Sequence, residues 1–258
     1  MKRLAIAGCL ALLVAPAAGA QDFQWKGRIA AGKWLEVKGV NGDVRATAAA
    51  GAEAEVTAAK TARRSEPESV EIVVLEHDDG VTICAVYPTP PRARRENTCQ
   101  PGEDWSSSNE NNDVRVHFTV RVPAGVRFRG ATVNGEMEAL GLRADAAVST
   151  VNGSVRVETT GFAEARTVNG SIDAVMGRAD WSEEADFRTV NGGITLTFPG
   201  ALNAEVRAQT VNGDIESDWP VTVRGRFGPK RVTGTIGTGG RTLHLETVNG
   251  SIRLRKST

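Results

Sequence analysis

Apolar and polar residues alternate along most of the second half of the chain, and the alternation slips by one residue at a recurrent cassette, Thr-Val-Asn-Gly. The copy at 210–213 shows this most clearly, with Leu202, Ala204, Val206 and Ala208 in phase before it and Ile215 in phase after it. Strict alternation indicates a strand with one buried face. A slip at a fixed place indicates a bend or bulge. The pattern therefore predicts repeats of two strand arms joined at a corner.

The corners recur at intervals of 18, 17, 22 and 21 residues between the asparagines at positions 134, 152, 169, 191 and 212. The full set of predicted corner asparagines is Asn41, Asn134, Asn152, Asn169, Asn191, Asn212 and Asn249. A degenerate copy, with Thr233 in place of Asn, fills the gap between the last two. Self-similarity at about 20 residues is typical of stacked repeats. Asn and Gly suit a corner because both tolerate a positive φ.

Two all-β structures fit these repeats. One is a parallel β-solenoid with irregular coils of about 16–22 residues, in which each arm pairs with the same arm of the next coil. The other is an antiparallel meander or sandwich, because Asn-Gly between alternating strands is also a hairpin signal. We favour the solenoid because a coil can point the valine before each Asn inward, whereas a hairpin leaves it on the polar face. In that arrangement Asn stacks on Asn, and Asn249 is the terminal copy with only Thr233 below it.

Residues 1–20 have the features of a secretory signal peptide. Lys2 and Arg3 precede an apolar run, and a small-residue site ends at Ala20. We expect cleavage between Ala20 and Gln21 rather than lipidation of Cys9, and a location in the periplasm or cell envelope. Cleavage removes two of 31 basic residues and none of 31 acidic ones, which leaves a net charge of −2. That charge gives no electrostatic case for a nucleic-acid partner, and no later apolar run is long enough for a transmembrane segment.

The remaining chain is expected to form an N-terminal β region, 21–130, followed by the repeats, 131–258, as one continuous domain over 21–258. Segments 70–75, 81–87 and 114–122 are strand-like. A long irregular loop spans 88–113, and loops of this length are often functional or disordered. Its basic cluster, Arg92, Arg94 and Arg95, could meet an anionic glycan, although a solvated loop is the simpler interpretation.

Cys84 and Cys99 are the only cysteines left after cleavage. An even pair in an oxidising compartment indicates a disulfide. Cys84 falls in a predicted strand and Cys99 in the long loop, so the bond would pin the loop to the sheet.

Catalytic, cofactor-binding and metal-binding residues are not predicted. The three histidines, at positions 77, 117 and 244, show no metal-ligand spacing, and the chain has no nucleophile elbow or phosphate loop. His117 and His244 lie on the polar phase of their strands. Acidic residues near the corners are scattered, whereas a glycosidase needs two at a set separation. Asp173 and Asp214 could form such a pair only by chance.

The strand Trp34 to Val37 leading into the Val40 cassette, then serial Thr-Val-Asn-Gly-Ser/Asp-Ile cassettes behind a signal peptide, resembles a bacterial family of exported β-strand-repeat proteins. The resemblance covers position 30 to the C-terminus. Its members have no established function and are often labelled adhesins. It implies a β-solenoid, an envelope location and no catalytic residues. We therefore expect a non-enzymatic binding, adhesin-like or scaffolding module, whose partner is an envelope protein or a glycan. The alternative is a carbohydrate-active β-solenoid enzyme.

Overall fold

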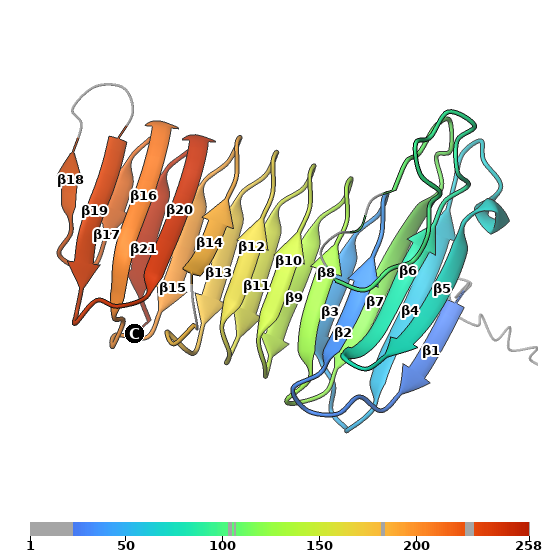
Figure 1. Ribbon diagram of the computed structural model, residues 1–258, viewed down its shortest axis with the longest axis horizontal. Coiled ribbons are helices and arrows are strands. Elements are labelled where there is room, and N and C mark those ends of the chain that lie inside the picture. Colours follow the sequence, from blue (N-terminus) through green and yellow to red (C-terminus); the bar gives the residue numbers. More distant parts are fainter. Residues whose placement is uncertain (1–22, 103–104, 106, 182–183, 225–229, 258) are drawn as a thin grey trace, which may run out of the picture.

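The protein is an all-β molecule built from two large mixed sheets, which confirms the predicted class (Figure 1). The structure is a computed structural model, and it describes residues 23–102, 105, 107–181, 184–224 and 230–257. The predicted signal peptide, 1–20, lies outside these residues. The described helical structure is a single short 3-10 turn, η1 (Pro67–Ser69).

The first sheet has ten strands. In spatial order they are β1 (Phe23–Gly27), β4 (Ala54–Thr61), β7 (Arg115–Val122), β3 (Val44–Ala48), β9 (Met137–Leu142), β11 (Val155–Thr159), β13 (Ile172–Met176), β15 (Ile194–Phe198), β21 (Ile252–Lys256) and β17 (Ile215–Ser217).

The second sheet has eleven strands. In spatial order they are β18 (Thr222–Arg224), β19 (Lys230–Ile236), β16 (Ala204–Asn212), β20 (Thr242–Asn249), β14 (Glu184–Arg188), β12 (Ala163–Arg166), β10 (Ala146–Ser149), β8 (Arg127–Ala131), β2 (Trp34–Lys38), β6 (Gly80–Val86) and β5 (Glu71–His77).

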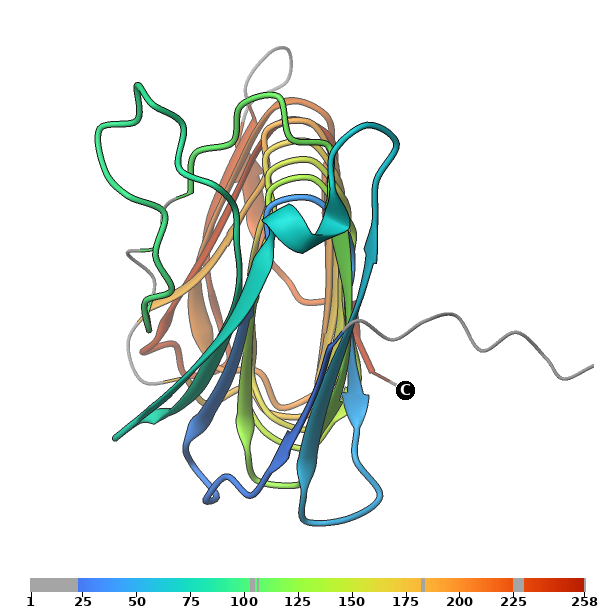
Figure 2. The ribbon, with the colours of Figure 1, turned by 90° about the vertical axis from the view of Figure 1, so that its right-hand side faces the viewer.

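Each Val-Asn-Gly corner carries the chain from the second sheet to the first, so the two strands beside a corner do not pair with each other. Strands of the same kind pair in parallel instead: β8, β10, β12 and β14 in one sheet, and β9, β11, β13 and β15 in the other. Viewed along the long axis, the two sheets face each other and the corners form a row of similar arcs (Figure 2). The alternating apolar residues fill the space between the sheets.

The last repeat does not lie at the end of the stack, which corrects the expectation for Asn249. Strands β20 and β21 insert between β14 and β16 and between β15 and β17, so Asn249 lies between Asn191 and Asn212. The degenerate copy around Thr233 is not a corner. It lies within the straight strand β19, which pairs antiparallel with β16. Asn212 is therefore the terminal asparagine.

The first cassette joins the repeats across a long insertion. Strand β2 pairs in parallel with β8, and β3 pairs with β9, which brings Asn41 beside Asn134. The intervening residues supply β4 to β7, and these add antiparallel pairs at this end of both sheets. The N-terminal β region and the repeats thus share both sheets.

In the repeats that follow the insertion, the corner threonines point into the molecule. Thr132, Thr150, Thr167, Thr189, Thr210 and Thr247 are all buried. The valine that follows is exposed by 38–39% at Val151, Val168 and Val190. The expected inward valine is therefore wrong for these three corners, whereas Val40 of the first cassette is buried as expected. The threonine is favoured inside because its hydroxyl donates to a glycine carbonyl of the adjacent repeat, as in Thr150 to Gly135 at 3.0 Å.

Candidate functional site

A groove crosses the outer face of the second sheet, where three small side chains interrupt a surface of long charged ones. Its floor is Ala131 on β8 with Ala147 and Ser149 on β10. Ser149 lies beside Ala131 in the strand register, and Ala147 lies beside Arg129. Alternation places all of these outward, because Ala146 and Val148 between them are buried.

The groove has charged and aromatic walls and a volume of about 320 Å³. In the strand register Arg129 and Glu164 flank Ala147 on its two neighbouring strands. Their Cα atoms are therefore two strand spacings, about 10 Å, apart. Arg166 follows on β12 and donates its Nε–H to Asp186 at 3.0 Å. Trp105, from the long loop, completes the lining. The site therefore offers donors, an acceptor and an aromatic ring around an uncharged floor.

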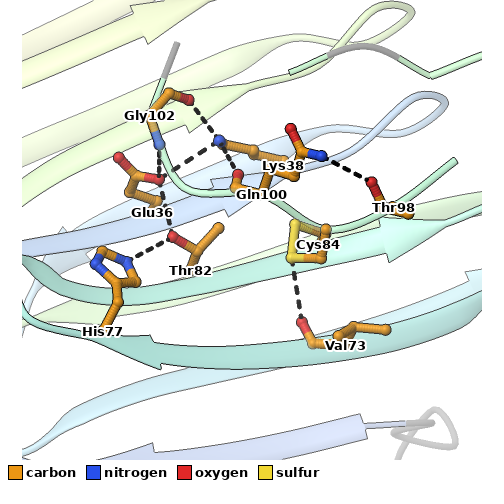
Figure 3. Close-up of a disulfide and its surroundings, with 10 residues drawn as sticks. Glu36, Lys38, Val73, His77, Thr82, Cys84, Thr98, Gln100 and Gly102 are labelled. Atoms are coloured by element: carbon orange, nitrogen blue, oxygen red, sulfur yellow. Dashed lines mark hydrogen bonds and ion pairs between the residues drawn. A yellow bond between two sulfur atoms is a disulfide. The ribbon is translucent and has the colours of Figure 1, made fainter. Parts of the chain in front are cut away.

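A buried ion pair supports one side of the groove (Figure 3). Glu36 and Lys38, two residues apart on β2, are 2% and 1% exposed, and the Lys38 Nζ lies 3.4 Å from the Glu36 carboxylate. Lys38 also donates to the backbone carbonyls of Gln100 and Gly102, at 2.5 Å each. The loop thus covers the pair, and the three donors of the ammonium group all have acceptors.

The Glu36 carboxylate is equally well satisfied. It accepts hydrogen bonds from the Gly102 N–H at 2.9 Å, from Thr82 at 2.9 Å and from Arg129 at 2.6 Å. Burial by itself would raise the pKa of Glu36, but these donors and Lys38 together hold that pKa below its usual value. Glu36 therefore stays ionised and acts as an anchor for the loop and for Arg129.

The loop is also attached covalently. Cys84 on β6 and Cys99 form a disulfide with their Cα atoms 5.5 Å apart. Cys99 is next to Gln100, so the bond holds the segment that covers Lys38 (Figure 3). The Arg129 guanidinium lies 4.3 Å from the centre of the Trp34 ring, a cation–π distance. The groove wall is therefore fixed by a disulfide, an ion pair and a stacked arginine.

The seven predicted corner asparagines form one ladder along an edge of the molecule. Six of the side-chain amides donate to the amide oxygen of a neighbouring asparagine at 2.7–2.8 Å, from Asn134 to Asn41 through to Asn212 to Asn249, and the Asn41 amide donates to the Val114 carbonyl at 3.4 Å. Among the described non-glycine residues only Asn111 has a positive φ. The expectation that the corner asparagines are favoured because they tolerate a positive φ was therefore wrong. The corner glycines are needed for space, since a Cβ on Gly153 would overlap the carbonyl oxygen of Gly135.

The three histidines make local contacts. His77 ends β5 before the Asp78–Asp79 turn, and its Nε2 lies 3.0 Å from the Thr82 hydroxyl. His117 lies beside Asp43, at 3.4 Å. His244 lies 3.0 Å from Asp186, which also pairs with Arg188. Within the described part of the chain, no group of three or more His, Cys, Asp or Glu side chains could hold a metal ion.

The carboxylates considered from the sequence are not brought together. Asp173 lies on β13 and Asp214 precedes β17, with β15 and β21 between those strands. Three strand spacings amount to about 14 Å, whereas the two carboxylates of a glycosidase lie about 5–9.5 Å apart. Asp214 instead pairs with Lys230.

The groove and the buried pair were missed from the sequence. Glu36 and Lys38 fall on the outward phase of their strand, and only the loop above them makes them buried. The signal present was the cysteine pair, which indicated that the loop returns to the sheet. The small outward residues Ala147 and Ser149, in a sheet otherwise lined by charges, were a second signal.

Among the described residues no helix has the length and apolar character needed to cross a bilayer. Two solved structures resemble this one. A candidate cell adhesion protein from Clostridium sporogenes ATCC 15579 is 12% identical, with a TM-score of 0.42 over 91% of this chain and 99% of that one. A candidate adhesin from Bacteroides fragilis NCTC 9343 is 12% identical, with a TM-score of 0.32 over 91% of this chain and 96% of that one. No curated protein matches the chain.

A match to a protein-family model gives stronger evidence of how the chain is related to known proteins. The Toastrack DUF4097 model matches residues 124–255, which include six of the seven corner asparagines. The resemblance inferred from the cassettes is thereby confirmed. Since the match spans just over half of the sequence, the chain belongs to the Toastrack DUF4097 family.

Proposed function

We propose that this protein is an exported, non-enzymatic binding or scaffolding module of the cell envelope, built as a short β-solenoid. The non-enzymatic part rests on how the carboxylates near the groove are used: among the described residues that line the groove, Glu164 is the single carboxylate. In the adjacent hollow that Glu164 shares, Asp145 and Asp180 pair with Arg178, and Glu184 lies 3.8 Å from His244. Hydrolysis of a glycosidic bond by the usual mechanism needs two carboxylates. The buried Glu36 is committed to four partners and supports the wall.

The rest of the proposal concerns location and organisation. Residues 1–20 act as a signal peptide cleaved before Gln21, and the mature chain works in the periplasm or envelope. The N-terminal β region, 21–130, and the repeats, 131–258, form one continuous domain, an arrangement supported by the pairing of β2 with β8 and of β3 with β9. The parallel pairing of like arms supports the solenoid description.

Two assays test this proposal together: one for release of product from a polysaccharide substrate, and one for retention of an envelope component by the immobilised protein. The purified mature chain should release no product from peptidoglycan or common polysaccharides, yet should retain an envelope component when immobilised. Reproducible cleavage that is abolished by Glu164→Gln, but not by the distant Asp173→Asn, would establish the enzyme instead.

A further inference from the structure

We infer that the groove over β8, β10 and β12 binds a sugar ring of an envelope glycan through side chains alone. This inference rests on the proposed binding function and names its ligand class. The floor of Ala131, Ala147 and Ser149 is built from small, uncharged side chains, and the partly buried Trp105 belongs to the lining. The C–H face of a sugar ring suits such a surface, because small side chains leave room for the ring and the indole adds apolar area.

The walls offer what ring hydroxyls need. Glu164 accepts hydrogen bonds, whereas Arg129 and Arg166, on the strands flanking β10, donate them. Across Ala147, Arg129 on β8 and Glu164 on β12 place a donor and an acceptor on opposite sides. This favours a ligand whose groups both donate and accept, and a hydroxyl is the simplest such group. Lys38 also lines the groove, but its three donors are already used by Glu36, Gln100 and Gly102.

The same geometry disfavours an extended peptide. Peptides that join a sheet are held by main-chain hydrogen bonds at an exposed edge. Strands β8, β10 and β12 are interior strands, each paired on both sides. A ligand over them can be held only by side chains. The volume of about 320 Å³ is near the lower end of small-ligand sites, which fits a short stretch of glycan.

The experiment uses isothermal titration of the mature, disulfide-bonded chain with short soluble oligosaccharides of neutral hexoses, N-acetylhexosamines or hexuronic acids. Saturable binding is expected for at least one of these three sets. Ser149→Trp, which fills the floor, should weaken it by about tenfold or more. Thr195→Trp, at an outward position of β15 in the opposite sheet, is the matched control and should bind as the wild type does. Glu164→Gln keeps the shape of the groove and should also weaken binding, which covers the case in which Ser149→Trp does not fold.

Absence of binding by every oligosaccharide, or binding that neither groove variant changes, would overturn the inference. A second measurement separates that failure from failure of the proposed function. If the immobilised wild type retains a deglycosylated envelope protein that Ser149→Trp loses, the binding module stands and the sugar ligand is rejected. If nothing is retained from the envelope, the proposed function fails as well.

Discussion

At the scale of single residues, the cassette is explained by contacts between adjacent repeats. The glycine carbonyl of one repeat accepts the threonine hydroxyl of the next, as in Gly153 and Thr167 at 2.9 Å. The backbones approach so closely there that a Cβ has no room. Threonine and glycine are therefore required by contacts with the neighbouring repeat. Asparagine is required by the amide–amide hydrogen bonds of the ladder.

Replacement of a corner glycine should be costly for this reason. In Gly153→Ala the new Cβ meets the Gly135 carbonyl, and overpacking against backbone should lower the free energy of unfolding by about 1–3 kcal/mol. Gly51→Ala is the control, because nothing lies within 4 Å of the new Cβ, and its effect should stay within about 0.5 kcal/mol. Denaturant unfolding compares the two, and equal losses would contradict the close-approach explanation.

Asp113, at the end of the long loop, should give the fold a specific acid sensitivity. Its carboxylate accepts backbone N–H groups of Ser65, Arg64 and Arg63, which lower its pKa from 3.8 to about 2. A depressed pKa in the folded state adds stability that is present above pH 3.8 and is lost as the pH falls toward 2. Asp113→Asn should remove this part of the pH dependence. A titration of the Asp113 carboxyl carbon by NMR with a midpoint at or above 3.8 would contradict the assignment.

At the scale of elements, the asparagine ladder separates interior repeats from the terminal one. Asn169 makes two amide–amide hydrogen bonds, to Asn152 and from Asn191, whereas Asn212 makes one, to Asn249. These bonds are solvent-exposed, so each should contribute no more than about 0.5–1.5 kcal/mol. Asn169→Ala should therefore destabilise the protein more than Asn212→Ala does. Thermal unfolding of both variants is the measurement, and a larger loss at Asn212 would contradict the ladder order.

The disulfide should matter for both the fold and the groove. Replacing Cys84 and Cys99 together with alanine opens a constraint that spans 15 residues, worth roughly 3 kcal/mol by chain entropy. Unfolding of the variant against the oxidised wild type measures that loss. The same variant should bind the groove ligand more weakly, since Gly102 and Trp105 belong to the disulfide-held loop. Unchanged stability would show that the loop is held by its hydrogen bonds alone.

The elements were largely predictable because one cassette is repeated in phase with the alternation. The strands around each corner follow from residues such as Val206, Ala208 and Ile215, all buried as expected. The insertion of β20 and β21 was not predictable, because an Asn-to-Asn contact satisfies any two neighbouring repeats equally. The groove needed a long-range contact, the loop over Lys38, which no local pattern encodes.

At the scale of the whole molecule, the two ends of the stack differ in their edge strands. Strands β1 and β5, each antiparallel to its one neighbour, end the two sheets at one side, and the three-residue strands β17 and β18 end them at the other. Short edge strands such as β17 and β18 limit pairing with another chain. We assign binding to the outer face of the second sheet, where the groove lies.

The most direct test of that assignment is a photo-crosslinking measurement in the native envelope. A photoreactive amino acid is placed either at Ser149, in the groove floor, or at Thr195, on the outer face of the opposite sheet. We expect a light-dependent adduct with an envelope component from position 149 and none from position 195. Adducts from position 195 alone, or none from either position in the exported protein, would contradict the claim that this groove is the binding surface.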